Sequence, residues 1–572
     1  MEVKWGIDEN DVKPGIYISS IEFNDNNSIS NIKHNDIVVF VGSNNVGKSQ
    51  TLKDIYNVLG QKEPIVIKDI TAVKSNKSFE LLVKKVGTEN GADVYTVMGN
   101  NVFTNNIDWW LSTDCNNNES LRNLFVCDLN TETRLSICRP APKINRNDPK
   151  VNPIQYVAFD PSIRKRLSNY FHEAFNKYIV PDVQYGNSFP LILLDSLIDL
   201  SARSFSDETE RAEFYASELN KHPQIQDQGD GVKSFVGILL YLMLDFYRVY
   251  LIDEPEAFLH PPQAKVMGQM IGRLSNNEKQ IFISTHSEHL IQGLIEAAPE
   301  RVKIVHISRE NNINHISILN KDDIQKVWTD PILKYSNVLE GLFYRNVVLC
   351  ESDSDCRFYS IINDAIQREQ QKYSETLFTY SGGKQRLSII VRALLSLGVD
   401  IRVITDFDVL NNREIFKRIC NACKIPWNII ESPYNIFYDG VQSQSKSSMK
   451  TKMQVISFME RLSKRNEKDS FFSDSELGMI KDELKMKSYW NILKTGGVYT
   501  LPAGEVRSAF DEINDIAQKH NLFIVPVGEL ECFIKQVGDH GPKWVNKVLE
   551  AYPDLSMPEY DGVKNFVRSL KL

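Results

Sequence analysis

A complete phosphate-binding loop near the start of the chain limits the possible folds more than any other feature. Residues 42–49, GSNNVGKS, match the P-loop pattern G-x-x-x-x-G-K-S, between an apolar strand-like stretch and a helical run over 49–59. Backbone N–H groups of such a loop surround phosphates, while its lysine neutralises the β- and γ-phosphates and its serine ligates magnesium. A chance Gly-Lys-Ser turn would not carry this context. We therefore expect a parallel α/β unit that binds ATP and Mg²⁺ through Gly42, Asn45, Gly47, Lys48 and Ser49.

Two acids end a later apolar strand, VYLID at 249–253. Asp253 is expected to hold the magnesium ion and Glu254 to polarise the attacking water. Taken alone, these would more often be exposed acids at a strand end, but the P-loop upstream favours the nucleotide role. Further on, the strand IFIST runs into His286, which is expected to sense the γ-phosphate. A histidine satisfied in the core is the alternative for that residue.

The order of these motifs resembles that of ABC-type ATPases. The segment GDGVKS at 229–234 resembles their signature motif and would place Gly231 at the nucleotide. In that superfamily, ATP lies between the P-loop of one subunit and the signature motif of another. The resemblance therefore implies a homodimer or a higher homo-oligomer. For the Q-loop of that superfamily the sequence offers only Gln155.

A second set of acids occupies strand ends in the other half of the chain. Glu351 ends the apolar stretch NVVLC and Asp355 follows it, while Asp406 and Asp408 follow the stretch IRVIT. Carboxyl ends of parallel strands meet at one sheet edge, and residues i and i+2 of a strand face the same side. Converging carboxylates repel one another without cations, and oxygen ligands suit Mg²⁺ or Mn²⁺. A solvated acidic edge of a domain that only binds nucleotide is the alternative.

These acids, with SGGK at 381–384 between them, resemble a TOPRIM domain. A P-loop ATPase followed by TOPRIM is similar to the OLD (overcoming lysogenization defect) family, which includes the Gabija nuclease and retron-associated effectors. The resemblance implies DNA cleavage with two divalent metals, bound by Glu351, Asp355, Asp406 and Asp408. It also implies a late acidic motif and a lysine that steadies the transition state, for which the candidates are Glu529, Glu531 and Lys543, with Lys547 second. In one departure from the family pattern, Ser352 replaces the usual glycine.

The predicted organisation is α/β throughout. An ABC-type ATPase domain is expected over 1–340, with a helical, dimerising insertion at about 161–225. A TOPRIM nuclease domain is expected over 341–572, with a helical insertion at about 441–490. Two late stretches, GGVYTLP and NLFIVPV, are predicted to be strands.

Composition narrows the class of protein further. The net charge of −8 argues against a histone-like coating of nucleic acid but leaves room for a local basic groove. One basic segment is either such a groove or a solvated helix face, and it holds Lys446, Lys450, Lys452, Arg461, Lys464, Arg465 and Lys468. The longest apolar run, 236–244, is too short to span a membrane. The start of the chain does not read as a signal peptide. The sparse cysteines suit a cytoplasmic location, and Cys420 and Cys423 are expected to be buried thiols rather than zinc ligands.

These features together predict an ATP-regulated, Mg²⁺- or Mn²⁺-dependent DNA endonuclease or nickase. The family resemblance implies a role in bacterial antiviral defence beside a partner, either a helicase or a reverse transcriptase with its RNA–DNA product. One rival is an SMC-like DNA-binding scaffold with an inactive TOPRIM domain. The other is an ATPase whose TOPRIM domain cuts RNA or a nucleotide.

Overall fold

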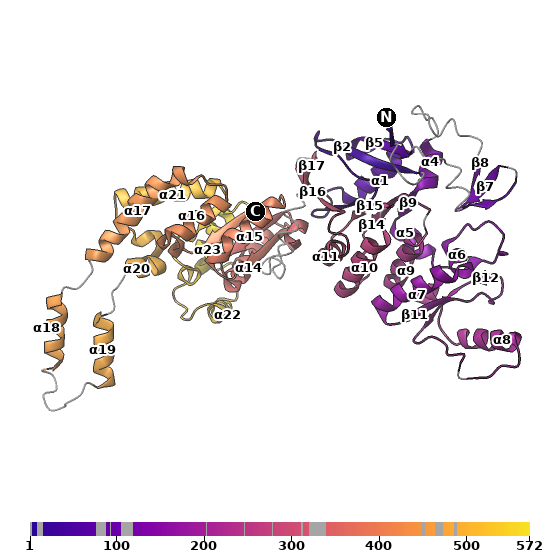
Figure 1. Ribbon diagram of the computed structural model, residues 1–572. Coiled ribbons are helices and arrows are strands. Elements are labelled where there is room, and N and C mark those ends of the chain that lie inside the picture. Colours follow the sequence, from indigo (N-terminus) through magenta and orange to yellow (C-terminus); the bar gives the residue numbers. More distant parts are fainter. Residues whose placement is uncertain are drawn as a thin grey trace. The chain divides into compact units, whose positions relative to one another are not determined.

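The computed structural model divides the chain into two compact units, Met1–Lys326 and Val327–Leu572 (Figure 1). It describes residues 3–8, 15–75, 87–91, 93–103, 118–201, 203–244, 246–276, 278–310, 313–319, 339–447, 452–463, 473–484 and 489–572. No helix within these ranges is both long enough and apolar enough to cross a membrane.

The first unit is built on a six-stranded sheet in which only one edge strand is antiparallel. Its order is β17 (Ile313–Ile318), β16 (Val302–Glu310), β4 (Ile37–Val41), β15 (Gln280–Ser284), β14 (Val249–Asp253) and β9 (Val126–Leu129). Strands β4 and β15 are buried at every position because elements cover both faces of the sheet. The P-loop strand therefore runs through the middle of a dry core, and its carboxyl end carries the loop.

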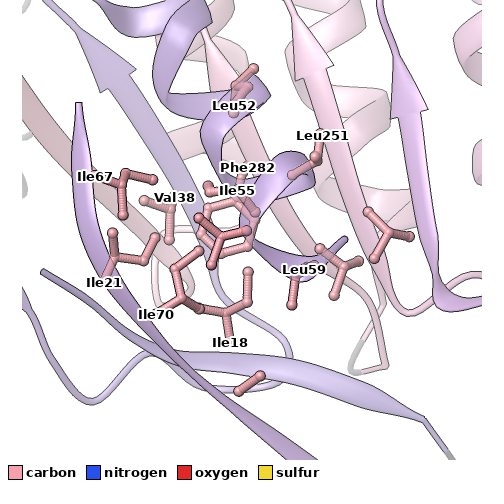
Figure 2. Close-up of a cluster of buried hydrophobic side chains, with 14 of the residues drawn as sticks. Ile18, Ile21, Val38, Leu52, Ile55, Leu59, Ile67, Ile70, Leu251 and Phe282 are labelled. Atoms are coloured by element: carbon pink, nitrogen blue, oxygen red, sulfur yellow. The ribbon is translucent and has the colours of Figure 1, made fainter. Parts of the chain in front are cut away.

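Helix α1 (Lys48–Leu59) lies between this sheet and a second one, ordered β1 (Lys4–Asp8), β5 (Ile67–Ser75), β2 (Ile16–Phe23) and β3 (Ser28–Ile29). Figure 2 shows its apolar side chains Leu52, Ile55 and Leu59 among residues of both sheets. The spacing of these three residues puts them on one face of the helix. Burial on both sides fixes α1, and so fixes the phosphate-binding loop at its N-terminus.

Helices α9 (Asp230–Leu242), α10 (Pro261–Leu274) and α11 (Glu288–Ala297) lie on the side of the large sheet away from α1 (Figure 1). Helices α10 and α11 approach very closely through glycines. A Cβ at Gly293 would lie 2.0 Å from the carbonyl oxygen of Lys265, and one at Gly268 would lie 2.2 Å from that of Leu290. Only glycine allows this contact, which sets the segment after β15 against the segment after β14.

The segment predicted as a helical insertion is helical at its ends but not in the middle. Helix α7 (Pro161–Phe175) and helix α8 (Glu208–Leu219) flank an antiparallel ladder of β11 (Tyr178–Pro181) and β13 (Leu191–Leu194). The stretches YIVP and LILL are too short for helices, and pairing lets them bury Ile192 and Leu194 beside Leu219 of α8. The helical pattern on either side did not predict this ladder.

The second unit has a four-stranded parallel sheet, ordered β19 (Thr376–Tyr380), β18 (Asn346–Cys350), β20 (Ile401–Thr405) and β21 (Leu522–Ile524). The chain leaves β18 through helix α14 (Asp353–Glu369) to β19, then returns through helix α15 (Lys384–Ser396) to β20 on the other side of β18. The topological switch point therefore lies between β18 and β20. In open α/β sheets, ligands bind outside the carboxyl ends of the strands at such a point.

Of the two late strands predicted, one is correct. NLFIVPV contains β21, but GGVYTLP forms a 3₁₀ turn, η4 (Gly497–Thr500). Gly497 has a φ of 52°, and a Cβ there would lie 2.0 Å from the carbonyl oxygen of Pro526. This close approach to the segment after β21 replaces strand pairing.

Helices α17 (Trp427–Ser447), α18 (Lys452–Ser463), α19 (Asp474–Leu484) and α20 (Tyr489–Gly496) occupy the region of the second predicted insertion. Of the seven basic residues expected there, only Arg461 has a described side chain, and it is exposed. Cys420 and Cys423 are both buried, as the sequence predicts.

Candidate nucleotide site and candidate metal centre

A pocket of about 790 Å³ opens at the P-loop. The loop backbone takes left-handed conformations at Asn45 (φ 61°) and Gly47 (φ 97°), which turn it into the N-terminus of α1. At Gly42 a Cβ would lie 2.1 Å from the carbonyl oxygen of Ile307 in the neighbouring strand β16. These are the positions that the sequence assigned to nucleotide binding, and the pocket is lined in part by Asn45, Gly47, Lys48, Ser49, Glu254 and His286.

Lys48 is buried and lies against its own loop. Its Nζ atom donates to the carbonyl oxygens of Gly42 at 2.9 Å and Ser43 at 2.7 Å. Burial lowers the pKa of Lys48 to about 8, although the acids at 253, 254 and 256 act in the opposite direction. Among the described residues, the hydrogen bonds of this buried cation go to carbonyl groups, which favours an anionic ligand in the pocket beside it.

Asp253 and Glu254 stand at the end of β14, as the sequence predicts. Asp253 accepts a hydrogen bond from the Ser284 hydroxyl of the adjacent strand β15. Glu254 has a φ of 47°, and its Oε1 atom lies 3.4 Å from Nε2 of His286. Burial, and then the charge of Lys48, lowers the pKa of His286 to about 4, so the imidazole is neutral at physiological pH. The pairing of a strained glutamate with a neutral histidine at the pocket fits the roles expected for a water-polarising residue and a phosphate sensor.

Two residues of this site were missed by sequence reasoning. Arg134 is buried and donates to the main-chain carbonyls of Asp253 and Glu254. Glu256 is also buried, and its Oε1 atom accepts from the Thr285 hydroxyl and from the His286 main-chain nitrogen, each at 2.7 Å. Neither residue stands in a motif position that signals such a role. Together they fix the backbone on which the acids and the histidine sit.

Two other predicted nucleotide contacts are not at this pocket. Gly231, in α9, packs against the segment after β14, where a Cβ would lie 2.4 Å from the carbonyl oxygen of Phe258. It does not line the pocket of its own chain. Gln155 is buried, and its side chain closes a capping box with Asn152 at the start of α6 (Pro153–Phe159). The Q-loop suggestion for Gln155 is therefore wrong, because the capping bonds occupy its amide.

The first acidic group of the second unit lies at the switch point between β18 and β20. Carboxylate oxygens of Glu351, Asp406 and Asp408 lie within 4.8 Å of one another. The expectation that the two aspartates lie on a strand is wrong, because β20 ends at Thr405 and a 3₁₀ helix, η3 (Phe407–Asn411), follows. The turn, and not the two-residue period of a strand, brings Asp408 back beside Asp406.

A second group of ligand atoms comes from the segment after β21. Glu529, Glu531 and His540 also offer ligand atoms within 4.8 Å of one another. The first two were predicted and His540 was missed. Strand β21 lies beside β20, and the Phe407 main-chain nitrogen donates to the Gly528 carbonyl at 2.8 Å. The two acidic groups therefore stand on adjacent strand ends of one sheet edge.

The charge of Asp355 interacts with acids of both groups. It closes a capping box with Ser352 at the N-terminus of α14, so the serine that departs from the family pattern is the N-cap of this helix. Burial, together with the charges of Glu531 and Glu529, raises the pKa of Asp355 to about 6, although the hydrogen bonds with Ser352 act in the opposite direction. Its carboxylate lies at the same edge but belongs to neither group of close ligand atoms among the described residues.

The acids at the switch point resist ionisation. Burial raises the pKa of Glu351 to about 7, helped by the charges of Asp408 and Asp355. Burial and the charge of Glu351 also raise the pKa of Asp406. Oxygen donors that repel one another at a buried sheet edge are the donor set that divalent cations such as Mg²⁺ and Mn²⁺ require. The residues present therefore fit the metals that the sequence implied.

The lysines that contact these acids differ from those predicted. Lys384 of the SGGK segment lies 2.9 Å from Oδ2 of Asp408, and Lys494 lies 3.2 Å from Oε2 of Glu529. Lys543 is exposed on α22 (Pro542–Ala551), and Lys547 pairs with Asp539 at 2.5 Å. Among the described ion pairs, those to the two acidic groups come from Lys384 and Lys494 and not from Lys543. The sequence did contain a signal for Lys384, because this lysine follows two glycines directly after a strand.

Comparison with known proteins finds an ATPase domain within the first unit and two nucleases among the relatives. A family model described as an AAA ATPase domain matches residues 158–291, which include the strand ending in Asp253 and the segment up to His286. The Old nuclease of Escherichia phage P2 is 22% identical over 316 residues, which is 50% of this chain and 49% of that protein. Endonuclease GajA of Bacillus cereus is 21% identical over 344 residues, 52% of this chain and 48% of that protein.

These relatives confirm the resemblance to OLD-family ATPase-nucleases. The chain spans about half the length of the curated relatives it matches. Among solved structures, the SMC head domain from Thermotoga maritima is similar over 54% of this chain and 100% of its own, at 13% identity and a TM-score of 0.29. A TM-score this low adds nothing to the α/β fold described above.

Proposed function

We propose that this protein is an ATP-binding, divalent-metal-dependent DNA endonuclease or nickase whose nuclease unit is gated by nucleotide. The observation that carries the proposal is the convergence of Glu351, Asp406 and Asp408 at the topological switch point of the second unit. The similarity to the Old nuclease and to endonuclease GajA supports it. The P-loop pocket of the first unit supplies the nucleotide-binding part.

In this proposal the two groups of ligand atoms hold one cation each. Glu351, Asp406 and Asp408 would bind the first, Glu529 and Glu531 the second, and Asp355 would lie at the same edge. Two bound cations would supply an activated water and stabilise the leaving oxygen of an in-line displacement. Carboxylates whose pKa is raised by burial would lose their protons when the cations bind, which couples metal binding to proton release.

The lysines of this edge would offset the negative charge of a phosphodiester. Lys384 and Lys494 already approach the acids within 3.2 Å, so both can pivot from a carboxylate to a phosphate oxygen. The family resemblance instead proposes Lys543 as the lysine that steadies the transition state. Hydrogen bonds from a lysine to phosphate oxygens would stabilise the transition state more than the ground state, because charge on those oxygens grows.

In the first unit, Lys48 and Ser49 would bind the triphosphate and its magnesium ion together with Asp253. Glu254 would accept a proton from the attacking water, while His286 would contact the γ-phosphate. Gly231 lies away from its own pocket, so we propose that it acts on the nucleotide of a second copy in a homodimer. Closing of such a dimer on ATP would then change the access of DNA to the nuclease unit.

The test is cleavage by the full-length protein. Supercoiled plasmid, linear DNA, transfer RNA and free nucleotides are incubated with the protein and Mn²⁺ or Mg²⁺, with and without ATP or a non-hydrolysable analogue. We expect nicked or linear plasmid, dependence on the metal and a change in rate with the analogue. Cleavage of RNA or nucleotides alone would favour the RNA or nucleotide rival. If no substrate were cut and an Asp406→Ala variant kept full biological activity, the protein would be an SMC-like scaffold.

The biological role proposed from the same resemblance is antiviral defence in bacteria. A partner, either a helicase or a reverse transcriptase with its RNA–DNA product, would provide the trigger. Protection of cells against phage by the gene and its neighbours, and loss of protection with Asp406→Ala, would support this role. Equal phage sensitivity with and without the genes would contradict it.

A further inference from the structure

The group formed by Glu529, Glu531 and His540 differs from the first group because it contains a nitrogen ligand. All three ligand atoms of Glu351, Asp406 and Asp408 are carboxylate oxygens. Carboxylates suit Mg²⁺ and Mn²⁺ alike, but an imidazole nitrogen is a ligand for transition metals rather than for Mg²⁺. The chemistry of the two groups therefore need not select the same cation.

The backbone brings His540 to the acids through a tight loop. Asp539 has a φ of 92° and Gly541 a φ of 62°, so both neighbours of the histidine take left-handed conformations. The Gly541 main-chain nitrogen donates to Oε1 of Glu531 at 2.8 Å, and Lys547 of α22 holds Asp539 at 2.5 Å. With these anchors, Nδ1 of His540 lies 3.6 Å from the same oxygen of Glu531.

A separate observation on a buried tyrosine points to a ligand at this edge. Tyr359 lies one turn after Asp355 on α14, and only 1% of its side chain is exposed. Its hydroxyl has no hydrogen-bond partner among the described residues. The charges of Asp355, Asp406 and Glu531 all act on that hydroxyl and, with burial, raise the pKa of Tyr359. The hydroxyl is thus buried, has no partner among the described residues, and lies near enough to Asp406 and Glu531 for one acid of each group to act on it. Such a group indicates that a ligand or its water completes the site.

We propose that Glu529, Glu531 and His540 form a cation site that prefers Mn²⁺ to Mg²⁺, and that His540 is the residue that determines this preference. The inference rests on the proposed nuclease function and deepens it by naming the metal of one site. The other site, with oxygen ligands only, accepts either cation. An exposed histidine with no ligand role is the alternative, since 80% of the His540 side chain is exposed.

The test measures metal binding directly, without nucleotide, so that the P-loop site contributes little. Mn²⁺ is titrated into the full-length protein and free Mn²⁺ is followed by electron paramagnetic resonance, and Mg²⁺ binding is followed by calorimetry. The variants are His540→Ala, Glu531→Gln, Asp408→Asn and, as a matched control, His520→Ala at the end of α21 (Glu505–Lys519). Thermal unfolding checks that each variant folds.

We expect His540→Ala to weaken one class of Mn²⁺ sites by about 10-fold or more and to leave Mg²⁺ binding unchanged. The His520→Ala control should bind both cations as the unaltered protein does. In the His540→Ala variant, the cleavage rate in Mn²⁺ divided by the rate in Mg²⁺ should also fall. If Glu531→Gln weakened Mn²⁺ binding but His540→Ala did not, the inference would be overturned while the nuclease proposal stood. If the unaltered protein bound no Mn²⁺ at sites that Asp408→Asn or Glu531→Gln removes, the nuclease proposal itself would fail.

Discussion

The main-chain nitrogen of Asp406 donates a hydrogen bond of 3.0 Å to Oε1 of Glu351, across 55 positions of the chain. This bond joins the end of β18 to the end of β20 at the switch point of the second unit. The bond holds the Glu351 carboxylate through a neutral main-chain donor. The position of this carboxylate therefore does not depend on a bound cation. A prepositioned carboxylate of this kind loses less freedom when a metal binds.

The first prediction concerns the two residues of that bond. Asp406→Asn keeps the main-chain donor but removes a charged ligand, so we expect cleavage of plasmid DNA to fall by at least ~100-fold. Glu351→Gln should do the same, since its amide oxygen can still accept the bond from residue 406 but no longer carries charge. A gel assay of nicked and linear products measures the effect. Retention of more than a tenth of the activity in both variants would show that these residues are not metal ligands.

The second prediction is a dependence of stability on pH. The pKa of Glu351 rises from 4.5 to about 7 in the folded protein, and that of Asp355 rises from 3.8 to about 6. The folded state therefore keeps protons that the unfolded state has released, and unfolding in this range releases protons. We expect stability of the metal-free protein to fall as pH rises from about 4 to about 7, and to level off above that range.

Glu351→Gln isolates this effect from all other titrating groups. The thermal midpoint of the variant in a chelating buffer should fall less between pH 5 and pH 8 than that of the unaltered protein. Adding Mn²⁺ should raise the midpoint of the unaltered protein most at the higher pH, because the cation stabilises the ionised carboxylates. Parallel curves for the two proteins would mean that Glu351 ionises normally.

A third prediction addresses the nucleotide pocket. Lys48→Ala removes the buried cation of the P-loop, and a charge-assisted contact with phosphate contributes about 1.5–3 kcal/mol, so affinity for ATP should fall by about 10- to 150-fold. The pKa of Lys48 is lowered to about 8 before nucleotide binds, and a triphosphate restores it. Binding at pH 8 should therefore take up part of a proton. Calorimetry in two buffers of different ionisation enthalpy measures both effects, and equal affinities in variant and unaltered protein would contradict the assignment.

Sequence reasoning placed the acids correctly where position along a strand was enough. Asp253 ends one buried apolar strand and Glu351 follows another, and parallel strands deliver their carboxyl ends to one edge whatever the details of packing. It failed where turns decide the geometry. Asp408 reaches Asp406 through a 3₁₀ turn, which the alternation of a strand could not reveal. Asp406 and Asp408 do lie close together, as expected, but because of this turn and not because of a strand.

Contacts that depend on distant parts of the chain were also beyond the sequence. His540 joins Glu531 only because a loop with two left-handed residues turns back, and no spacing rule marks such a loop. Arg134 reaches the main chain of Glu254 from a helix that precedes it by 120 positions. The strand expected at 496–502 became a turn because Gly497 packs against the backbone after β21. Local sequence patterns do not predict these tertiary contacts.

The last prediction separates the lysines of the metal centre. Lys384 contacts Asp408 at 2.9 Å, whereas the exposed Lys543 was chosen from the family resemblance alone. Substituting methionine keeps the length of either side chain and removes its charge. If Lys384 stabilises the phosphodiester, Lys384→Met should lower the rate constant of cleavage at saturating DNA by about 100-fold and leave the apparent Mn²⁺ affinity within a few-fold. Lys543→Met should then affect DNA affinity at most. Single-turnover cleavage at several DNA concentrations distinguishes the two, and the opposite pattern would return the transition-state role to Lys543.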